Sequence, residues 1–152
     1  MQIVAIAEPR EYFRKRTAEK FHLEPSQIFT DWKLIADKPK FADAVIITTP
    51  DRLHMEPAIA FANKGYHILL EKPMAVAENE CIDIVRAVHN NKVLLAVGHV
   101  LRYTPYTQKI KQLVSSGEIG DLINIQHVEP VGYYHFAHSY VRGNSFSPFD
   151  FT

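Results

Sequence analysis

The strongest constraint on the fold is an alternation between short apolar runs and longer segments whose apolar residues recur at helical spacing. The apolar runs occupy 3–7, 44–48, 67–70 and 93–97, and a brief strand is expected at 29–32. Helices are expected at 11–21, 55–62, 81–88 and 106–114, with a short helical turn at 32–36. Right-handed crossovers through such helices make neighbouring strands parallel. The sequence therefore predicts an α/β fold with an open, doubly wound parallel sheet, in which run 3–7 is typical of a strand buried on both faces.

The pattern changes after Gly120. Residues 122–128 are predicted to form a longer strand, the aromatic run 133–136 lacks helical spacing, and 145–152 has no periodicity. We therefore expect an α/β domain at 1–118 and the start of an α+β domain at 119–152. The aromatic run is open to three interpretations: a core strand, an interaction surface, or apolar surface left by an incomplete domain.

Composition argues against several classes of function. Seventeen Lys and Arg balance seventeen Asp and Glu in 152 residues, and no basic block indicates a nucleic-acid or membrane surface. No run of about 18 apolar residues is present, and the first residues do not read as a signal peptide. The single cysteine, Cys81, lies on the apolar side of a predicted helix, so we expect it in the core. One cysteine also fits a reducing, cytoplasmic setting.

Polar and titratable residues follow the predicted strands. These residues are Glu8, Arg10, Thr49, Pro50, His54, Glu71, Lys72, His99 and Arg102. Parallel strands present their carboxyl ends at one edge of a sheet, and α/β proteins bind ligands at that edge. We therefore expect the functional site to be built from these residues.

Glu8 ends the first predicted strand. An acidic residue at the end of the second strand of a dinucleotide-binding fold accepts hydrogen bonds from the ribose hydroxyls. The alternative interpretation is a solvated turn residue before Pro9. Arg10 and Arg14 can accommodate a 2′-phosphate, whereas Glu8 repels one, so NAD is favoured and NADP stays open.

Lys72 lies between Glu71 and Pro73 at the end of another predicted strand. The proline restricts Lys72 to extended backbone conformations, which aims its ammonium group. A lysine placed in this way can hydrogen-bond a substrate hydroxyl or relay its proton. The alternative is a surface lysine paired with Glu71, which contributes little.

His99 and Arg102 suit a polyhydroxylated or anionic substrate, although a histidine at a strand end is often only hydrogen-bonded scaffolding. His127, His135 and His138 match no compact zinc pattern, so no metal site is expected.

Four motifs follow one another along the chain: ADAVIITTPDRLH at 42–54, EKPMA at 71–75, GHVLRYTP at 98–105 and GEIG at 117–120. Over about residues 3–143, the chain resembles the N-terminal half of the Gfo/Idh/MocA family of NAD(P)-dependent oxidoreductases. The resemblance implies a Rossmann-type domain at 1–118 that binds NAD, with NADP possible. It also implies hydride transfer between nicotinamide and a carbinol carbon of a sugar, cyclitol or related polyol.

The resemblance further implies individual roles. Lys72 matches the catalytic lysine, and the bond before Pro73 is often cis in such enzymes. The implied cofactor-binding residues are Glu8 with the adjacent Arg10 on the adenosine ribose, Thr49, Pro50 and His54 along nicotinamide, and Glu71 and Lys72 at its ribose. His99 and Arg102 match positions near the substrate pocket.

The chain also departs from the family pattern. Its six glycines form no Gly-x-Gly-x-x-Gly turn, and it begins at what resembles the second strand, so roughly 20 to 30 residues are expected to be missing before Met1. The absent first strand is central in the usual order, so the two halves of the sheet should separate. The family's C-terminal Asp and His are not matched after Gly143. These departures predict weak or absent activity, or alternatively a non-catalytic shortened isoform that binds nucleotide or pairs with itself or a full-length relative.

Overall fold

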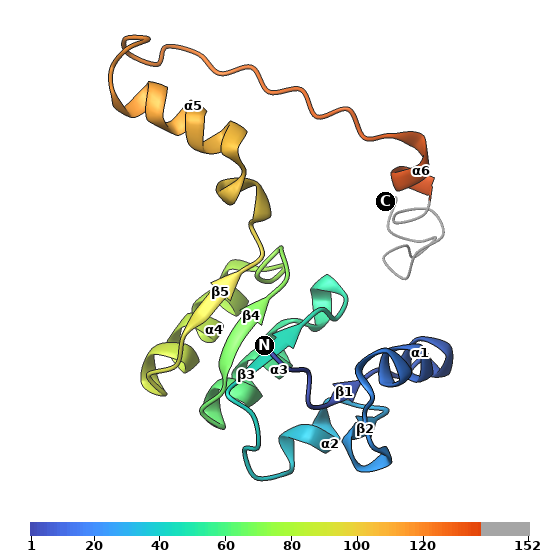
Figure 1. The fold of residues 1–152 in the computed structure, drawn as a ribbon. Helices are drawn as coiled ribbons and strands as arrows, with labels where there is room; N and C mark the ends of the chain where they lie inside the picture. Colours follow the sequence, from blue (N-terminus) through green and yellow to red (C-terminus); the bar gives the residue numbers. More distant parts are fainter. Residues whose placement is uncertain (138–152) are drawn as a thin grey trace, which may run out of the picture. The chain divides into compact units, whose positions relative to one another are not determined.

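A computed structural model describes residues 1–137, in which strands and helices alternate as the sequence predicts (Figure 1). The strands are β1 (Ile6–Ala7), β2 (Ile28–Phe29), β3 (Ala44–Ile47), β4 (His67–Leu70) and β5 (Leu95–Val97). The helices are α1 (Glu11–Phe21), α2 (Lys33–Ala36), α3 (Met55–Asn63), α4 (Glu78–Asn90), α5 (Pro105–Ser115) and α6 (Tyr133–His135). The chain divides into two compact units, Met1–Gly98 and a second unit that begins at His99.

The described strands of the first unit form two separate parallel sheets. One pairs β1 with β2, and the other has the order β3-β4-β5. The two halves of the sheet are therefore separate among the described strands, as expected from the sequence. The α/β class and the parallel pairing are confirmed.

Strand β1 is shorter than predicted. Residues 3–7 form an apolar run, but only Ile6 and Ala7 pair, opposite Ile28 and Phe29 of β2. Both residues of β1 are half-buried rather than fully buried. Strand β1 pairs along one edge only, and its partner β2 offers just two residues, so the pairing cannot continue along the run 3–7. The prediction that this strand is buried on both faces is therefore wrong.

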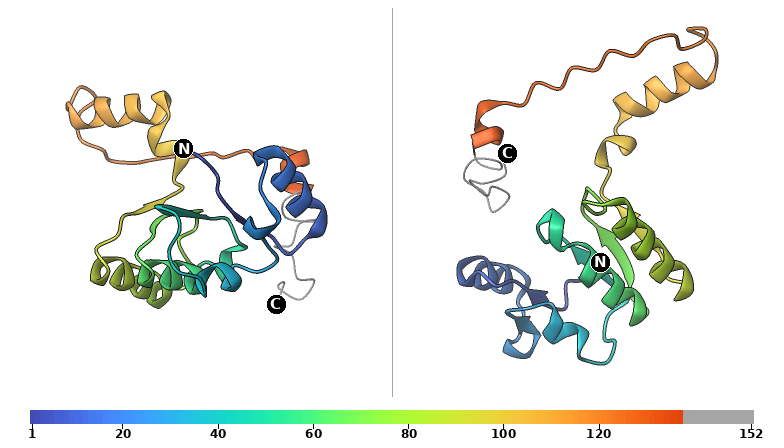
Figure 2. Two further views of the ribbon diagram at one scale, coloured as in Figure 1. Left: turned by 60° about the horizontal axis from the view of Figure 1, so that its bottom comes forward. Right: turned by 180° about the vertical axis from the view of Figure 1, so that it is seen from behind.

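Helices α3 and α4 lie on the same face of the three-stranded sheet (Figure 2, left). Both crossovers run the same way along the sheet, and right-handed crossovers of one direction place their helices on one side. The core of the unit lies between this face and the two helices, with Phe61, Leu70 and Ile84 almost or fully inaccessible to solvent. Cys81 of α4 is half-buried rather than deep in this core.

The opposite face of this sheet is exposed in the described part of the chain. Ile46, Leu69 and Ala96 stand side by side in the strand register, and Ile46 and Leu69 keep 44% and 43% of their surface accessible. Exposed and buried side chains therefore alternate along β3 and β4, since Ile47 follows Ile46 and is buried, and Leu70 follows Leu69 and is buried.

In the second unit, the predicted helix is confirmed as α5, which begins after Thr104. The Thr104 side chain accepts a hydrogen bond from the backbone of Thr107, which stabilises the first turn. The predicted strand at 122–128 is wrong, because these residues form no regular structure and Ile123 is 95% exposed. A strand requires a hydrogen-bonding neighbour, and the described residues supply none here.

The aromatic run forms the short helix α6 instead of a core strand. The predicted domain boundary at 118/119 stays a prediction, although α5 belongs to the compact unit that begins at His99. His138 and the tail 145–152 lie outside the described residues.

Candidate functional site at the strand ends

The parallel register of β3, β4 and β5 brings the predicted site residues that follow β3 and β4 to one edge. Ile47, Leu70 and Val97 are aligned as the last residues of the three strands. Two further backbone hydrogen bonds extend the ladder, from Glu71 N–H to the Ile47 carbonyl at 3.0 Å and from Gly98 N–H to the Leu70 carbonyl at 2.8 Å. Turns that leave the sheet from this level carry Thr49, Glu71 and Lys72.

The carboxylate of Glu71 lies against the backbone of Gly98. A Cβ atom placed on Gly98 would stand 3.1 Å from Glu71 Oε2 and 3.2 Å from its Cδ and Oε1. Only a residue without a side chain leaves this space free. Sequence reasoning missed Gly98 as a site residue, although a glycine between a strand and His99 was a signal that could have identified it.

Glu71 binds the backbone of Lys72 rather than its ammonium group. Lys72 N–H donates to Glu71 Oε2 at 3.2 Å, and the Lys72–Pro73 peptide bond is cis, as the resemblance implied. Within residues 1–137, no ion pair or hydrogen bond engages the exposed Lys72 ammonium. Its backbone is therefore anchored while its charged end faces solvent.

His54 joins the turn after β3 to the turn after β4. Its ring is fully buried, with Nδ1 2.7 Å from the Pro73 carbonyl oxygen and Nε2 2.8 Å from the Thr49 carbonyl oxygen. Thr49 Oγ1 also donates to the carbonyl of Leu53 at 3.0 Å. The structure thus brings Thr49, His54 and the Lys72–Pro73 turn together.

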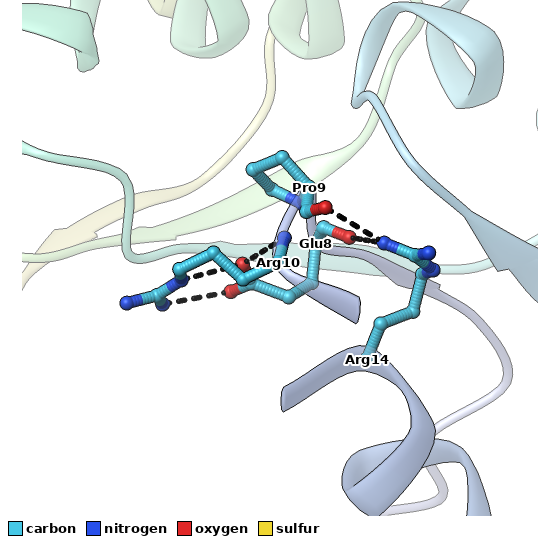
Figure 3. Close-up of polar contacts among 4 residues, drawn as sticks. All are labelled: Glu8, Pro9, Arg10 and Arg14. Atoms are coloured by element: carbon cyan, nitrogen blue, oxygen red, sulfur yellow. Dashed lines mark hydrogen bonds and ion pairs between the residues drawn. The ribbon is translucent and has the colours of Figure 1, made fainter. Parts of the chain in front are cut away.

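Glu8 and Arg10 form a second, local cluster at the end of β1 (Figure 3). Arg10 binds both carboxylate oxygens of Glu8, through Nε to Oε1 at 2.8 Å and through Nη2 to Oε2 at 2.9 Å. The Arg10 backbone N–H adds a third bond to Oε1 at 2.9 Å. These hydrogen bonds hold the pKa of Glu8 below its usual value, and the Glu8 carboxylate raises the pKa of Arg10.

Arg14 of helix α1 hydrogen-bonds to the backbone of the same turn. Its Nη1 donates to the Glu8 carbonyl at 2.7 Å and to the Pro9 carbonyl at 2.9 Å (Figure 3). The carboxylate of Glu8 is therefore held by Arg10, and the backbone that carries it is held by Arg14.

His99 and Arg102 belong to the second unit. Arg102 N–H donates to the His99 carbonyl at 3.0 Å at the start of the 3-10 turn Val100–Tyr103, and both side chains are exposed. The structure describes them by themselves, so their expected contact with substrate stays a prediction.

Two shallow hollows on the first unit are lined by other residues. One, of about 470 Å³, lies between α2 and α3, and the other, of about 730 Å³, lies along α1. Across residues 1–137, no group of three or more His, Cys, Asp and Glu side chains could hold a metal ion, and no helix has the length and apolarity to cross a membrane.

Parallel strands with polar turns at their carboxyl ends define the class as a dinucleotide-binding α/β domain of the Rossmann type. The model of the Gfo/Idh/MocA family, described as an oxidoreductase family with an NAD-binding Rossmann fold, matches residues 1–99. The chain belongs to this family. The resemblance is therefore confirmed, and NAD is the cofactor that the family's fold binds.

Known relatives extend well beyond the matched region. Levoglucosan dehydrogenase of Pseudarthrobacter phenanthrenivorans is 34% identical over 121 residues, which are 80% of this chain and 30% of the relative. A scyllo-inositol 2-dehydrogenase (NADP(+)) of Bacillus subtilis is 37% identical over 84 residues, 55% of this chain and 24% of the relative. The solved structure of levoglucosan dehydrogenase in complex with NADH and levoglucosan matches with a TM-score of 0.67 and 34% identity, over 78% of this chain and 31% of that one. The chain spans about a quarter to a third of the length of these relatives.

Proposed function

We propose that this chain carries the cofactor-binding half of an oxidoreductase site. In this site Lys72 accepts or returns the proton of the substrate hydroxyl, and hydride passes between NAD and the carbinol carbon that bears this hydroxyl. The observation that carries this proposal is the turn after β4, where the backbone of Lys72 is anchored and its ammonium is free of partners in the described residues. Such a group can bind a substrate hydroxyl and move its proton.

The other residues of the edge fit a nicotinamide nucleotide. Thr49, Pro50 and Glu71 leave the carboxyl ends of neighbouring parallel strands, where the fold binds its cofactor. Glu71 Oε1 accepts no hydrogen bond from residues 1–137, so it can accept one from a ribose hydroxyl. NAD supplies the hydride chemistry, and the protein supplies orientation and proton handling.

The adenosine end of the site depends on Glu8 and Arg10. Glu8 can accept from ribose hydroxyls only when Arg10 releases part of its hold, since both oxygens are engaged. A released Arg10 would face a 2′-phosphate instead. We therefore infer that the pair allows both cofactors and that the glutamate favours NAD.

The substrate class follows from the relatives and from the exposed His99 and Arg102. The relatives named above act, by name, on levoglucosan and scyllo-inositol, which are both polyhydroxylated rings. A sugar, cyclitol or related polyol matches the hydrogen-bonding capacity of a histidine and an arginine.

We propose that these 152 residues alone have weak or no dehydrogenase activity. Their glycines form no Gly-x-Gly-x-x-Gly turn to receive the pyrophosphate, and the described strands make two sheets rather than one. Their single, half-buried Cys81 agrees with the proposed cytoplasmic setting.

A second candidate function is a non-catalytic interaction module. The exposed apolar row of Ile46, Leu69 and Ala96 favours it, since such a row can pair with a second copy or a full-length relative. Light scattering of the purified chain separates the two candidates. A dimer that Leu69→Lys dissociates supports this function, and a chain that stays monomeric and binds no full-length relative in co-purification contradicts it.

Calorimetric titration with NADH and NADPH tests the first proposal. We expect weak binding of NADH that Lys72→Ala reduces and that Lys111→Ala, an exposed lysine of α5, leaves unchanged. No heat of binding and no thermal protection by either nucleotide would overturn it.

A further inference from the structure

The buried ring of His54 faces two acceptors. Nδ1 lies 2.7 Å from the carbonyl oxygen of Pro73, and Nε2 lies 2.8 Å from the carbonyl oxygen of Thr49. The ring has no accessible surface. A carbonyl oxygen only accepts hydrogen bonds, so the ring supplies the donor of this bridge.

The two carbonyls belong to the two turns that form the candidate site. Thr49 follows β3, and Pro73 is bonded directly to Lys72. His54 itself is fixed, because its backbone carbonyl accepts from Ala58 N–H at 3.2 Å as α3 begins. The ring therefore connects helix α3 to the backbone next to the lysine.

We propose that His54 is a positioning residue, whose buried ring bridges the two turns and so fixes the backbone from which Lys72 reaches its substrate. This inference rests on the proposed role of Lys72. It differs from the contact with nicotinamide implied by the resemblance, because a ring without accessible surface leaves no atom for a cofactor to touch.

The other bonds of these turns show why the ring matters. The turn after β3 has its own backbone bond, from Leu53 N–H to the Pro50 carbonyl at 2.7 Å. The turn after β4 has the bond from Lys72 N–H to the Glu71 carboxylate at 3.2 Å, which is local. The His54 bond is the contact that ties Pro73 to a segment 19 residues away.

Nitrogen-15 NMR of the histidine rings in the full chain tests the proposal without cofactor. We expect a slowly exchanging ring N–H proton of His54, hydrogen-bonded to the Pro73 or the Thr49 carbonyl. Rapid exchange of every His54 ring proton would overturn the bridge.

Backbone amide exchange tests the positioning role. In His54→Phe, which keeps an aromatic ring and removes both ring nitrogens, the Lys72 amide should exchange at least tenfold faster than in the wild type. The control Phe61→Leu perturbs an equally buried residue of α3 and should raise exchange throughout the core without singling out Lys72. His54→Gln, which restores one donor, should recover part of the protection.

Unchanged exchange at Lys72 in a folded His54→Phe would contradict the positioning role, and if that variant does not fold, His54→Gln and the wild-type ring spectrum still decide. Failure to bind NADH in calorimetry would overturn the proposed function and leave these NMR results standing. The two outcomes are therefore distinguishable.

Discussion

Arg10 binds the carboxylate of Glu8 in a bidentate manner, with Nε donating to Oε1 at 2.8 Å and Nη2 donating to Oε2 at 2.9 Å (Figure 3). The acid expected to bind the cofactor ribose is thus already paired within its own turn. Arg10 and the ribose hydroxyls compete for the same two oxygens.

Removal of Arg10 should shift the balance between the two cofactors. Arg10→Gln frees Glu8, so NADH should bind about two- to fivefold more tightly, as expected from the release of a partly exposed ion pair of about 0.2–1 kcal/mol. NADPH should bind more weakly because its 2′-phosphate loses a cation. Calorimetry measures both, with Arg86→Gln as the control, since that arginine forms an exposed pair with Asp83 elsewhere.

The same pair should give an acid-dependent contribution to stability. The pKa of Glu8 is lowered in the folded protein, chiefly by its hydrogen bond from Arg10, so the unfolded chain binds the proton more readily. The contribution is present above the ordinary value of 4.5 and is lost as the pH falls through the lower folded value. Urea unfolding should show wild type more stable than Glu8→Gln by up to about 1 kcal/mol at pH 7.

The difference between wild type and Glu8→Gln should shrink as the solution is acidified below 4.5. Arg10→Gln should lose the same acid-dependent part, because either substitution breaks the pair. If the difference in unfolding free energy between wild type and Glu8→Gln stayed constant with pH, Glu8 would stabilise the fold by packing and not by its charge.

Gly98 is predicted to control the position of Glu71. In Gly98→Ala the new Cβ would meet the Glu71 carboxylate at 3.1–3.2 Å, and the flexible glutamate side chain would move aside. The free energy of unfolding should change by less than about 1 kcal/mol, whereas the affinity for NADH should fall. Gly132→Ala, where a Cβ meets nothing within 4 Å, is the matched control and should change neither. Equal NADH affinity in both variants would show that the position of Glu71 does not affect cofactor binding.

The one-sided cover of the three-stranded sheet predicts contrasting effects for two adjacent leucines. Leu70 is fully buried and Leu69 is 43% exposed on the other face. Leu70→Ala should cost about 2–5 kcal/mol of unfolding free energy, and Leu69→Ala about 1 kcal/mol or less. Urea denaturation measures both, and similar costs would mean that the exposed face is covered in solution.

Much of this fold was predictable because the signals are local. Helix α1 and strand β4 occupy 11–21 and 67–70 as predicted, since each has a continuous pattern and residues that end it. The strand predicted at 122–128 failed for the opposite reason: apolar alternation alone does not supply a neighbouring strand.

The candidate site was predictable in its residues but not in its contacts. Strand ends identified Glu71 and Lys72 after β4, where topology places such residues at one edge of the three-stranded sheet, and Glu8 at the end of β1 in the separate two-stranded sheet. The contact between Glu71 and Gly98, and that between His54 and Pro73, join segments far apart in the sequence, and no pattern within one segment reports them.

The most direct test of the central claim is a titration of the nitrogen-15-labelled chain with NADH, followed by amide NMR. The account predicts that the largest shifts fall on Thr49, Glu71, Lys72 and Gly98, with a second group around Glu8. Lys72→Ala should weaken the response without moving its location. No shifts at millimolar NADH, or shifts confined to residues away from the strand ends, would contradict the proposed site.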